Sequence, residues 1–109
     1  LAIHARVEAG EEEPMCIACG GILKTTTVSF GQGLPPETIG RALELHASAR
    51  LCLVIGSSLG VYPAATLPEL TLQAGGQLAI VNLSETHLDG RAIFVAREPA
   101  AELFGRVRV

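Results

Sequence analysis

The sequence predicts an α/β fold whose strands pair in parallel. Predicted strands and helices alternate along the chain, and the composition is 49% hydrophobic but only 4% aromatic, as in cores of strands packed on helices. Two inner strands, "LCLVIG" and "QLAIVNL", are continuous apolar runs, which is typical of parallel strands covered on both faces. At 109 residues the chain forms one domain at most, and we expect right-handed crossovers between its strands.

Composition and the positions of proline predict the elements of the first half of the chain. Residues 1–15 contain the acidic run "EAGEEEP", which predicts a solvated loop. Residues 22–30, "ILKTTTVSF", have the composition of a strand, and "GQGLPP" ends it. Residues 37–49 predict a helix with Ile39, Leu43 and Ala47 on its buried side.

The second half continues the alternation. The apolar run 50–56 predicts a strand, "SSLGVYP" a loop, and residues 64–75 a helix ended by Gly75 and Gly76. Residues 77–83 and 92–96 predict two further strands. Residues 99–107 predict a closing helix with Pro99 in its first turn.

Charge and hydropathy exclude several classes of partner. The net charge is −3 without any basic cluster, which argues against nucleic acid. No apolar run approaches the roughly 20 residues that span a bilayer, and no signal peptide is recognisable. We therefore expect a cytoplasmic protein without a membrane partner. Because the chain begins "LAIHARV" without an initiator methionine, we expect it to be the back part of a longer protein.

The stretch "MCIACGG" indicates half of a zinc site at Cys16 and Cys19. A two-residue spacer lets both thiolates reach one ion at about 2.3 Å, but a closed structural site needs two more donors. Cys52 lies in an apolar strand and is expected to be a small buried hydrophobe, and His4 alone would leave the ion one ligand short. A thiol–disulfide motif and an uninvolved turn remain alternatives, although the former expects a helix directly after the cysteines.

Polar residues follow two of the apolar strands. "GSSLGVYP" offers Gly56, Ser57 and Ser58, and "NLSET" offers Asn82, whose amide can bond a ribose hydroxyl or an adenine edge. Ligands of parallel sheets bind at the carboxyl ends of the strands, so these residues predict one nucleotide site. Neither common glycine-rich phosphate motif is present, and ordinary turns are the alternative for both stretches.

Three stretches, in this order along the chain, resemble the C-terminal half of a sirtuin, a member of the NAD-dependent protein deacylases: "CIACGGILKTTTVSFGQGLP", "LCLVIGSSLGVYPAATLP" and "AIVNLSETHLD".

 The resemblance is to the bacterial type of that family. It implies a partial doubly wound, Rossmann-like parallel sheet of the NAD/FAD-binding (DHS-like) kind, with half of a small zinc-binding module at its N-terminal end. Residues 1–33 would be the second half of that module with the substrate-binding strand, and residues 34–109 the C-terminal half of the NAD-binding domain.

The same resemblance assigns roles to individual residues. Cys16 and Cys19 would hold a structural zinc, with the other two ligands upstream of Leu1. The NAD-binding positions would be Gly56, Ser57, Ser58, Asn82, Leu83, Ser84 and Ala100, and the positions that bind the acylated-lysine peptide would be Val28, Phe30 and Gly31. Gln32 departs from the family's usual acid, and "KTTTV" from a more typical segment, which affects peptide preference. From the residues alone, Val28 and Phe30 are also consistent with core, and Ala100 with a helix start.

The function that the resemblance implies is NAD-dependent protein-lysine deacetylation by the complete protein. His4, His46 and His87 do not match the context of the family's catalytic histidine, so the chain on its own is expected to be inactive. The alternatives are a non-catalytic module that binds NAD or ADP-ribose, a sirtuin-like mono-ADP-ribosyltransferase, the central domain of a thiamine-diphosphate enzyme, and a structural zinc ribbon. An incomplete sheet would also leave an open edge and exposed apolar faces, which favour aggregation or dimerisation.

Overall fold

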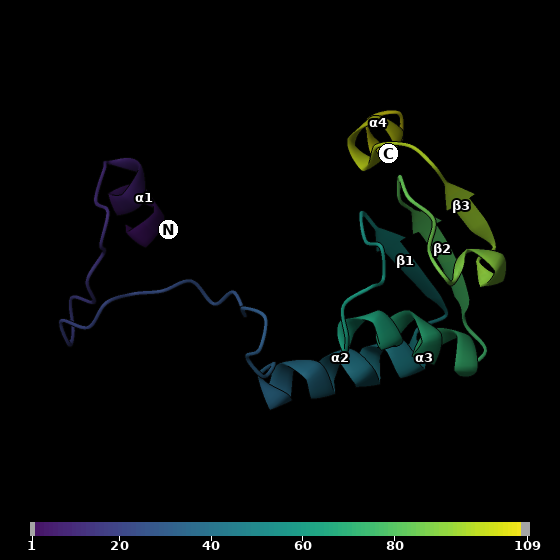
Figure 1. Ribbon diagram of the computed structural model, residues 1–109, viewed down its shortest axis with the longest axis horizontal. Coiled ribbons are helices and arrows are strands. Elements are labelled where there is room, and N and C mark those ends of the chain that lie inside the picture. The colour runs from purple at the N-terminus through teal and green to yellow at the C-terminus, as the bar shows by residue number, and fades with distance from the viewer. Residues whose placement is uncertain (1, 108–109) are drawn as a thin grey trace. The chain divides into compact units, whose positions relative to one another are not determined.

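The computed structural model describes residues 2–107, and the chain forms two compact units, Leu1–Gly33 and Leu34–Val109. We call them the N-terminal unit and the C-terminal unit. The first contains helix α1 (Ala2–Glu8). The second contains, in chain order, α2 (Pro36–Ser48), β1 (Leu51–Ile55), the 3₁₀ helix η1 (Ala64–Thr66), α3 (Leu67–Gln73), β2 (Gln77–Val81), the 3₁₀ helix η2 (Asp89–Arg91), β3 (Phe94–Ala96) and α4 (Ala100–Gly105) (Figure 1). Within residues 2–107 no helix is long and apolar enough to cross a membrane.

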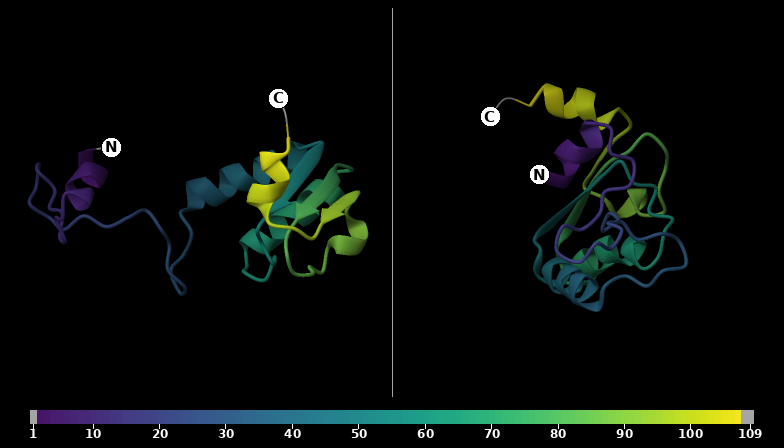
Figure 2. Two further views of the ribbon diagram at one scale, coloured as in Figure 1. Left: turned by 90° about the horizontal axis from the view of Figure 1, so that it is seen from above. Right: turned by 90° about the vertical axis from the view of Figure 1, so that its left-hand side faces the viewer.

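The C-terminal unit is built on a parallel sheet with strand order β1-β2-β3. The register between β1 and β2 runs from Leu51 opposite Gln77 to Ile55 opposite Val81. Helix α3 packs on β1 and β2, and α2 lies alongside α3 (Figures 1 and 2). The predicted parallel α/β architecture is therefore confirmed, and the crossover between β2 and β3 contains only the short η2.

The hydrophobic core lies on one face of this sheet. Val54, Leu78 and Ile80 point to that face from β1 and β2, and Leu59, Ala65 and Leu88 complete the buried cluster. Leu72 of α3 packs against it. Side chains alternate between the two faces of a strand, so the neighbours of Val54 in β1 must point the other way.

That other face of β1 is open in this chain. Leu51, Leu53 and Ile55 are 54%, 47% and 47% exposed, and Phe94 on the same face is 51% exposed. The prediction that this apolar strand is covered on both faces is therefore wrong for the described residues. The reason is that α3 packs on the Val54 face of the sheet, and among the described residues no helix packs extensively on the opposite face of β1. An open edge and an exposed apolar face are what the sequence predicts for an incomplete sheet.

Helix α2 forms where it is predicted, but with a different buried side. Leu43 and Ala47 are exposed, whereas Ile39, Ala42 and His46 are partly buried. These three have the i, i+3, i+7 spacing of one helical face, and α2 packs mainly on α3. Ala42 lies on this partly buried face of α2, whereas the neighbouring Leu43, one residue further round the helix, is 40% exposed.

The loop predicted for the acidic run "EAGEEEP" is confirmed, because residues 9–14 lie outside the helices and strands of the structure. The segment before it, Ala2–Glu8, is helical, and alanine, arginine and glutamate are good helix formers. The strand predicted for the N-terminal unit is wrong. Residues 22–30 do not form a strand: within the described chain only Ile22 pairs, in an isolated antiparallel bridge with Met15. Threonine-rich composition favours a strand only where a partner strand offers hydrogen bonds, and residues 24–30 have no such ladder among residues 2–107.

A buried threonine joins α3 to the end of α2. The Thr71 side chain is fully buried, and its Oγ1 donates a hydrogen bond of 2.9 Å to the His46 carbonyl oxygen. Valine has the same shape without the donor, so Thr71→Val should lower the free energy of unfolding by about 1 kcal/mol. Urea denaturation of the intact protein measures this. Thr66→Val is the matched control, because the Thr66 hydroxyl bonds Pro63 O at an exposed site, and equal losses in both variants would contradict the expectation.

Candidate functional site

The polar stretches after β1 and β2 lie next to each other. Ile55 and Val81 are the last paired residues of the two strands, and Gly56 N donates a hydrogen bond of 2.8 Å to Val81 O. Gly56 and Asn82 are therefore the first residues beyond the ladder on neighbouring strands. We call Gly56, Ser57, Ser58, Asn82, Leu83 and Ser84 the strand-end cluster. It occupies the carboxyl edge of the sheet, where parallel α/β proteins bind their ligands.

The first half of the cluster is a tight turn. Gly56 has φ +61°, a left-handed conformation that glycine adopts without strain, and no atom lies within 4 Å of the position that a Cβ would take. Ser57 Oγ accepts a hydrogen bond of 3.2 Å from Leu59 N. The Leu59 side chain is buried and anchors the turn in the core, while Ser57 and Ser58 stay exposed. The turn thus presents backbone and hydroxyl groups to solvent at the strand end.

The second half is held by Asn82, whose side chain is nearly buried at 8% exposure. Asn82 N donates to Ala96 O at 3.1 Å, which ties the residue to the end of β3. Its Nδ2 donates to Ser84 O at 2.9 Å and to Ser84 Oγ at 3.1 Å. Ser84 thus engages the Asn82 Nδ2 donor, and the amide oxygen is the side-chain group that can accept a hydrogen bond from a ligand hydroxyl.

The loop after Asn82 is closed by side chains that the sequence analysis missed. Arg97 pairs with Asp89 and donates to Ser84 O at 2.7 Å. Asp89 in turn accepts hydrogen bonds from Thr86 N at 3.1 Å and Thr86 Oγ1 at 2.6 Å. The Thr86 hydroxyl, with its backbone N–H and Arg97, holds the pKa of Asp89 below its usual value. The Thr-x-x-Asp spacing resembles a capping box and could have predicted the Thr86–Asp89 turn, but not the partner Arg97.

Ala100 begins α4, directly after Pro99 in the N-cap position. The helix-start interpretation of this residue is therefore confirmed. Because α4 follows β3, Ala100 lies beyond the carboxyl end of that strand (Figure 1).

The N-terminal unit contains Cys16 and Cys19, separated by two residues, in a turn closed by hydrogen bonds. Cys16 N donates to Gly21 O and Gly20 N donates to Cys16 O, both at 2.8 Å, and Gly20 has φ +71°. The backbone N–H groups of Ala18 and Cys19 point at the Cys16 sulfur and lower the pKa of its thiol. Amides directed at a sulfur favour the thiolate, the form that binds zinc.

The fit to a structural zinc is therefore half complete. Cys16 and Cys19 supply two of the four donors of such a site. Among residues 2–107 no three His, Cys, Asp or Glu side chains come together as a metal cluster. Cys52 lies in β1, in the other unit, where burial raises the pKa of its thiol.

Arg6 braces this turn from α1. Its Nε and Nη2 donate to the two carboxylate oxygens of Glu11 at 2.6 and 2.5 Å, and its Nη1 donates to Met15 O at 2.9 Å. The bidentate pair keeps the pKa of Glu11 low. Met15 precedes Cys16, so the ion pair fixes the entry to the cysteine turn.

The predicted peptide-binding residues lie in the exposed end of the N-terminal unit. Phe30 is 92% exposed, so its interpretation as a core residue is wrong. Gly31 has φ +86° in a turn closed by Gln32 N donating to Ser29 O at 3.0 Å. Val28 is also exposed, at 39%. An exposed phenylalanine beside a tight turn is available for contact with a peptide.

The three histidines each have a local partner. His4 Nδ1 lies 3.4 Å from a carboxylate oxygen of Glu8. His46 Nδ1 lies 2.8 Å from Ala42 O within α2, and His87 Nε2 lies 3.2 Å from a Glu69 carboxylate oxygen. None of these contacts belongs to the strand-end cluster.

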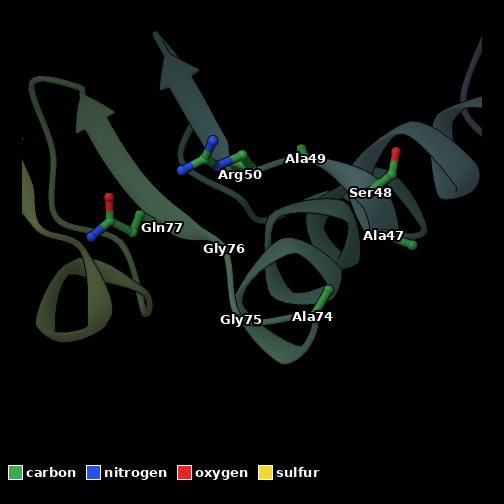
Figure 3. A pocket seen from close by; sticks show the side chains of 8 residues that line it. All are labelled: Ala47, Ser48, Ala49, Arg50, Ala74, Gly75, Gly76 and Gln77. Atoms are coloured by element: carbon green, nitrogen blue, oxygen red, sulfur yellow. The ribbon is translucent and has the colours of Figure 1, made fainter.

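A pocket of about 350 Å³ opens at the other end of the strands, where β1 and β2 begin (Figure 3). Its walls are the last turn of α2 with the residues that follow it, and the turn that joins α3 to β2: Ala47, Ser48, Ala49, Arg50, Ala74, Gly75, Gly76 and Gln77. These residues lie at the amino ends of β1 and β2, where parallel sheets do not usually bind ligands. We therefore place the candidate site at the strand-end cluster and not in this pocket.

A parallel sheet with polar residues gathered where two adjacent strands end is the arrangement of the doubly wound class of α/β proteins, which bind their ligands at this end of the sheet. The particular family follows from comparison with known proteins. Residues 2–63 match the model of the Sir2 family, and the chain belongs to that family.

Curated relatives and solved structures agree with this assignment. The chain is 43% identical over 97 residues to NAD-dependent protein deacetylase 2 of Streptomyces coelicolor, covering 89% of this chain and 40% of the relative. It is 45% identical over 97 residues to an NAD-dependent protein deacetylase of Caldivirga maquilingensis, covering 89% of this chain and 37% of that protein. The chain thus spans about two fifths of the length of the curated relatives it matches.

Two solved structures show the same fold at 38% sequence identity. One is a Sir2 protein with a p53 peptide and NAD+, with a TM-score of 0.75 over 95% of this chain and 43% of that one. The other is a Sir2 protein bound to a propionylated peptide, with a TM-score of 0.76 over 97% of this chain and 44% of that one. The Rossmann-like α/β class that the sequence predicts is confirmed by these structures.

Proposed function

We propose that the protein carrying this chain is an NAD-dependent protein-lysine deacetylase, and that the strand-end cluster forms part of its NAD site. The observation that carries the proposal is the adjacency of Gly56 and Asn82 at the carboxyl edge of the sheet, in a chain of the Sir2 family. The relatives named above as NAD-dependent deacetylases support it. Residues 1–109 by themselves are proposed to be inactive.

The geometry of the cluster fits a dinucleotide. The Gly56 turn leaves room for close backbone approach, so that Ser57, Ser58 and free amides can bond phosphate and ribose oxygens. The Asn82 amide oxygen would accept a ribose hydroxyl, with Leu83, Ser84 and Ala100 beside the nucleoside. When bound, NAD would supply the ADP-ribose group that accepts the acyl group as nicotinamide leaves, and the lysine would be released as the free amine. Our proposal gives this chain's residues the roles of binding and orienting NAD.

The N-terminal unit has two proposed roles. Val28, Phe30 and Gly31 would contact the acylated-lysine peptide, and the exposure of Phe30 supports this. Cys16 and Cys19 would hold a structural zinc together with two donors from outside residues 2–107, supported by the amides that favour the Cys16 thiolate. A reducing compartment such as the cytoplasm would keep both thiols available.

The direct test uses the intact protein with an acetylated-lysine peptide. We expect deacetylation of the peptide that requires NAD and releases nicotinamide. Mass spectrometry measures the loss of the acetyl group from the peptide, and liquid chromatography measures the nicotinamide. Label transferred from NAD to a protein side chain, without loss of acetyl, would replace the proposal with an ADP-ribosyltransferase. NAD binding without nicotinamide release would replace it with a binding module.

Gly56→Ala tests the location of the NAD site. A Cβ at Gly56 would enter the space at the strand end, and we expect the KM for NAD to rise about tenfold, which corresponds to roughly 1.4 kcal/mol of binding. Gly75→Ala is the matched control. Gly75 also has a positive φ, of 84°, and open space around its Cβ position, but it lies at the opposite edge of the sheet.

Both substitutions impose a similar backbone strain of about 1 kcal/mol, so the stability change cancels in the comparison. Steady-state kinetics with NAD as the varied substrate give the two KM values. Equal KM values for Gly56→Ala and the wild type would remove Gly56 from the site.

A further inference from the structure

A single guanidinium, that of Arg97, joins the two ends of the loop from Asn82 to Asp89. Arg97, just after β3, donates from Nη1 to Ser84 O at 2.7 Å and to Asn82 O at 3.4 Å. Its Nη2 bonds the carboxylate of Asp89 at the other end of the loop. One planar group therefore ties the nucleotide end of the loop to its far end.

The far end is itself fixed. Asp89 holds the Thr86 N–H and hydroxyl, and the Thr86 hydroxyl also accepts a hydrogen bond of 3.3 Å from Leu88 N. The Leu88 side chain is 2% exposed in the hydrophobic core. A continuous path of hydrogen bonds thus leads from the buried Leu88 through Thr86, Asp89 and Arg97 to the carbonyl groups of Asn82 and Ser84.

We propose that Arg97 and Asp89 are positioning residues for the Asn82–Ser84 stretch of the NAD site. This inference rests on the proposed function. The Arg97 charge is paired with Asp89, and its other nitrogen bonds two backbone carbonyls, so its role is to shape the loop and not to bind a phosphate. Without Arg97, the carbonyls of Asn82 and Ser84 lose their shared donor, and the Asn82 side chain loses the fixed Ser84 on which its orientation depends.

Arg97→Ala in the intact protein tests the role. Hydrogen bonds that involve a charged group are among the stronger ones, so we expect the KM for NAD to rise about tenfold. The value of kcat at saturating NAD should change less than about threefold, because ligand binding can reorder the loop. Arg97→Lys should give an intermediate KM, since an ammonium group cannot reproduce the planar two-sided contact. Arg106→Ala is the matched control, because Arg106 pairs with Glu98, also eight residues away, on an exposed surface.

Asp89→Asn separates positioning from direct contact with the ligand. If Arg97 positions the loop, loss of the Asp89 charge should raise the KM for NAD. If Arg97 instead binds an NAD phosphate, its release from Asp89 should lower the KM or leave it unchanged, and that result would overturn the proposal. Urea denaturation of every variant accompanies the kinetics. Should Arg97→Ala fail to fold, Arg97→Lys and Asp89→Asn supply the same comparison.

Two further outcomes distinguish this inference from the proposed function. A wild-type protein without NAD-dependent activity or NAD binding would overturn both. A wild-type protein with NAD-dependent deacetylation, together with Arg97→Ala and Asp89→Asn variants of unchanged KM, would overturn only the positioning role. A lowered stability with unchanged KM would assign the ion pair to folding alone.

Discussion

Replacing Cys16 with serine is expected to abolish zinc binding by the intact protein. Structural zinc sites bind with apparent free energies of about 10 to 16 kcal/mol, which becomes folding free energy when the site closes. A serine hydroxyl stays protonated at neutral pH and cannot replace a thiolate ligand. We expect the zinc content to fall from about one per molecule to near zero, with loss of the ordered cysteine turn and of activity. Atomic emission after gel filtration measures the metal directly.

Cys52→Ala is the matched control for that experiment. Cys52 lies in β1 with a partly buried thiol whose pKa is raised, so alanine should keep the full zinc content. Full zinc content in Cys16→Ser, or a loss of zinc in Cys52→Ala, would contradict the assignment of the cysteine turn as half of the site.

Gly76→Ala is expected to destabilise the C-terminal unit by about 3 kcal/mol, the upper end for overpacking a tight site. A Cβ at Gly76 would lie 2.5 Å from Ala49 O, 2.7 Å from Thr71 Cγ2 and 2.9 Å from Thr71 O. Two of these atoms belong to the backbone. They cannot withdraw easily, because Gly76 N donates to Thr71 O at 2.8 Å and Gln77 N donates to Arg50 O at 2.9 Å. Urea or thermal denaturation of the intact protein gives the loss.

Gly40→Ala provides a control of the opposite sign. Gly40 lies inside α2, with nothing within 4 Å of its Cβ position. Alanine is the better helix former by about 1 kcal/mol, so this variant should be slightly more stable than the wild type. Similar destabilisation by both substitutions would mean that the close contacts at Gly76 are relieved at little cost.

The strands of the sheet and the end of α3 could be predicted from the sequence, because each depends on the residues of its own segment. The apolar runs gave β1 and β2, and the glycines after residue 74 marked the end of α3, where Gly75 has φ +84°. The strand predicted at residues 22–30 failed because pairing depends on a partner segment. The prediction that β1 is covered on both faces failed for a similar reason, since the burial of a strand depends on what packs against it and not on its own composition.

In the candidate site, too, the residues set by their own segment could be predicted from the sequence, and those set by a distant partner could not. Gly56 and Asn82 could be chosen from the sequence because each directly follows an apolar strand. The brace between Arg97 and Asp89 could not, because an exposed arginine beside a strand has many possible partners. Only the register of β3 brings Arg97 to the loop, and that register is a property of the whole sheet.

The attachment of Asn82 to the last strand links ligand affinity to sheet stability. Strand β3 has only three residues, Phe94–Ala96, and its final carbonyl accepts the Asn82 N–H. A slip of β3 by one residue would move Arg97 by about 3.3 Å and turn it to the other face of the sheet. Any ligand that binds the ordered loop must therefore also select the correct pairing of β3, and by thermodynamic linkage its binding free energy is added to the stability of the shortest strand.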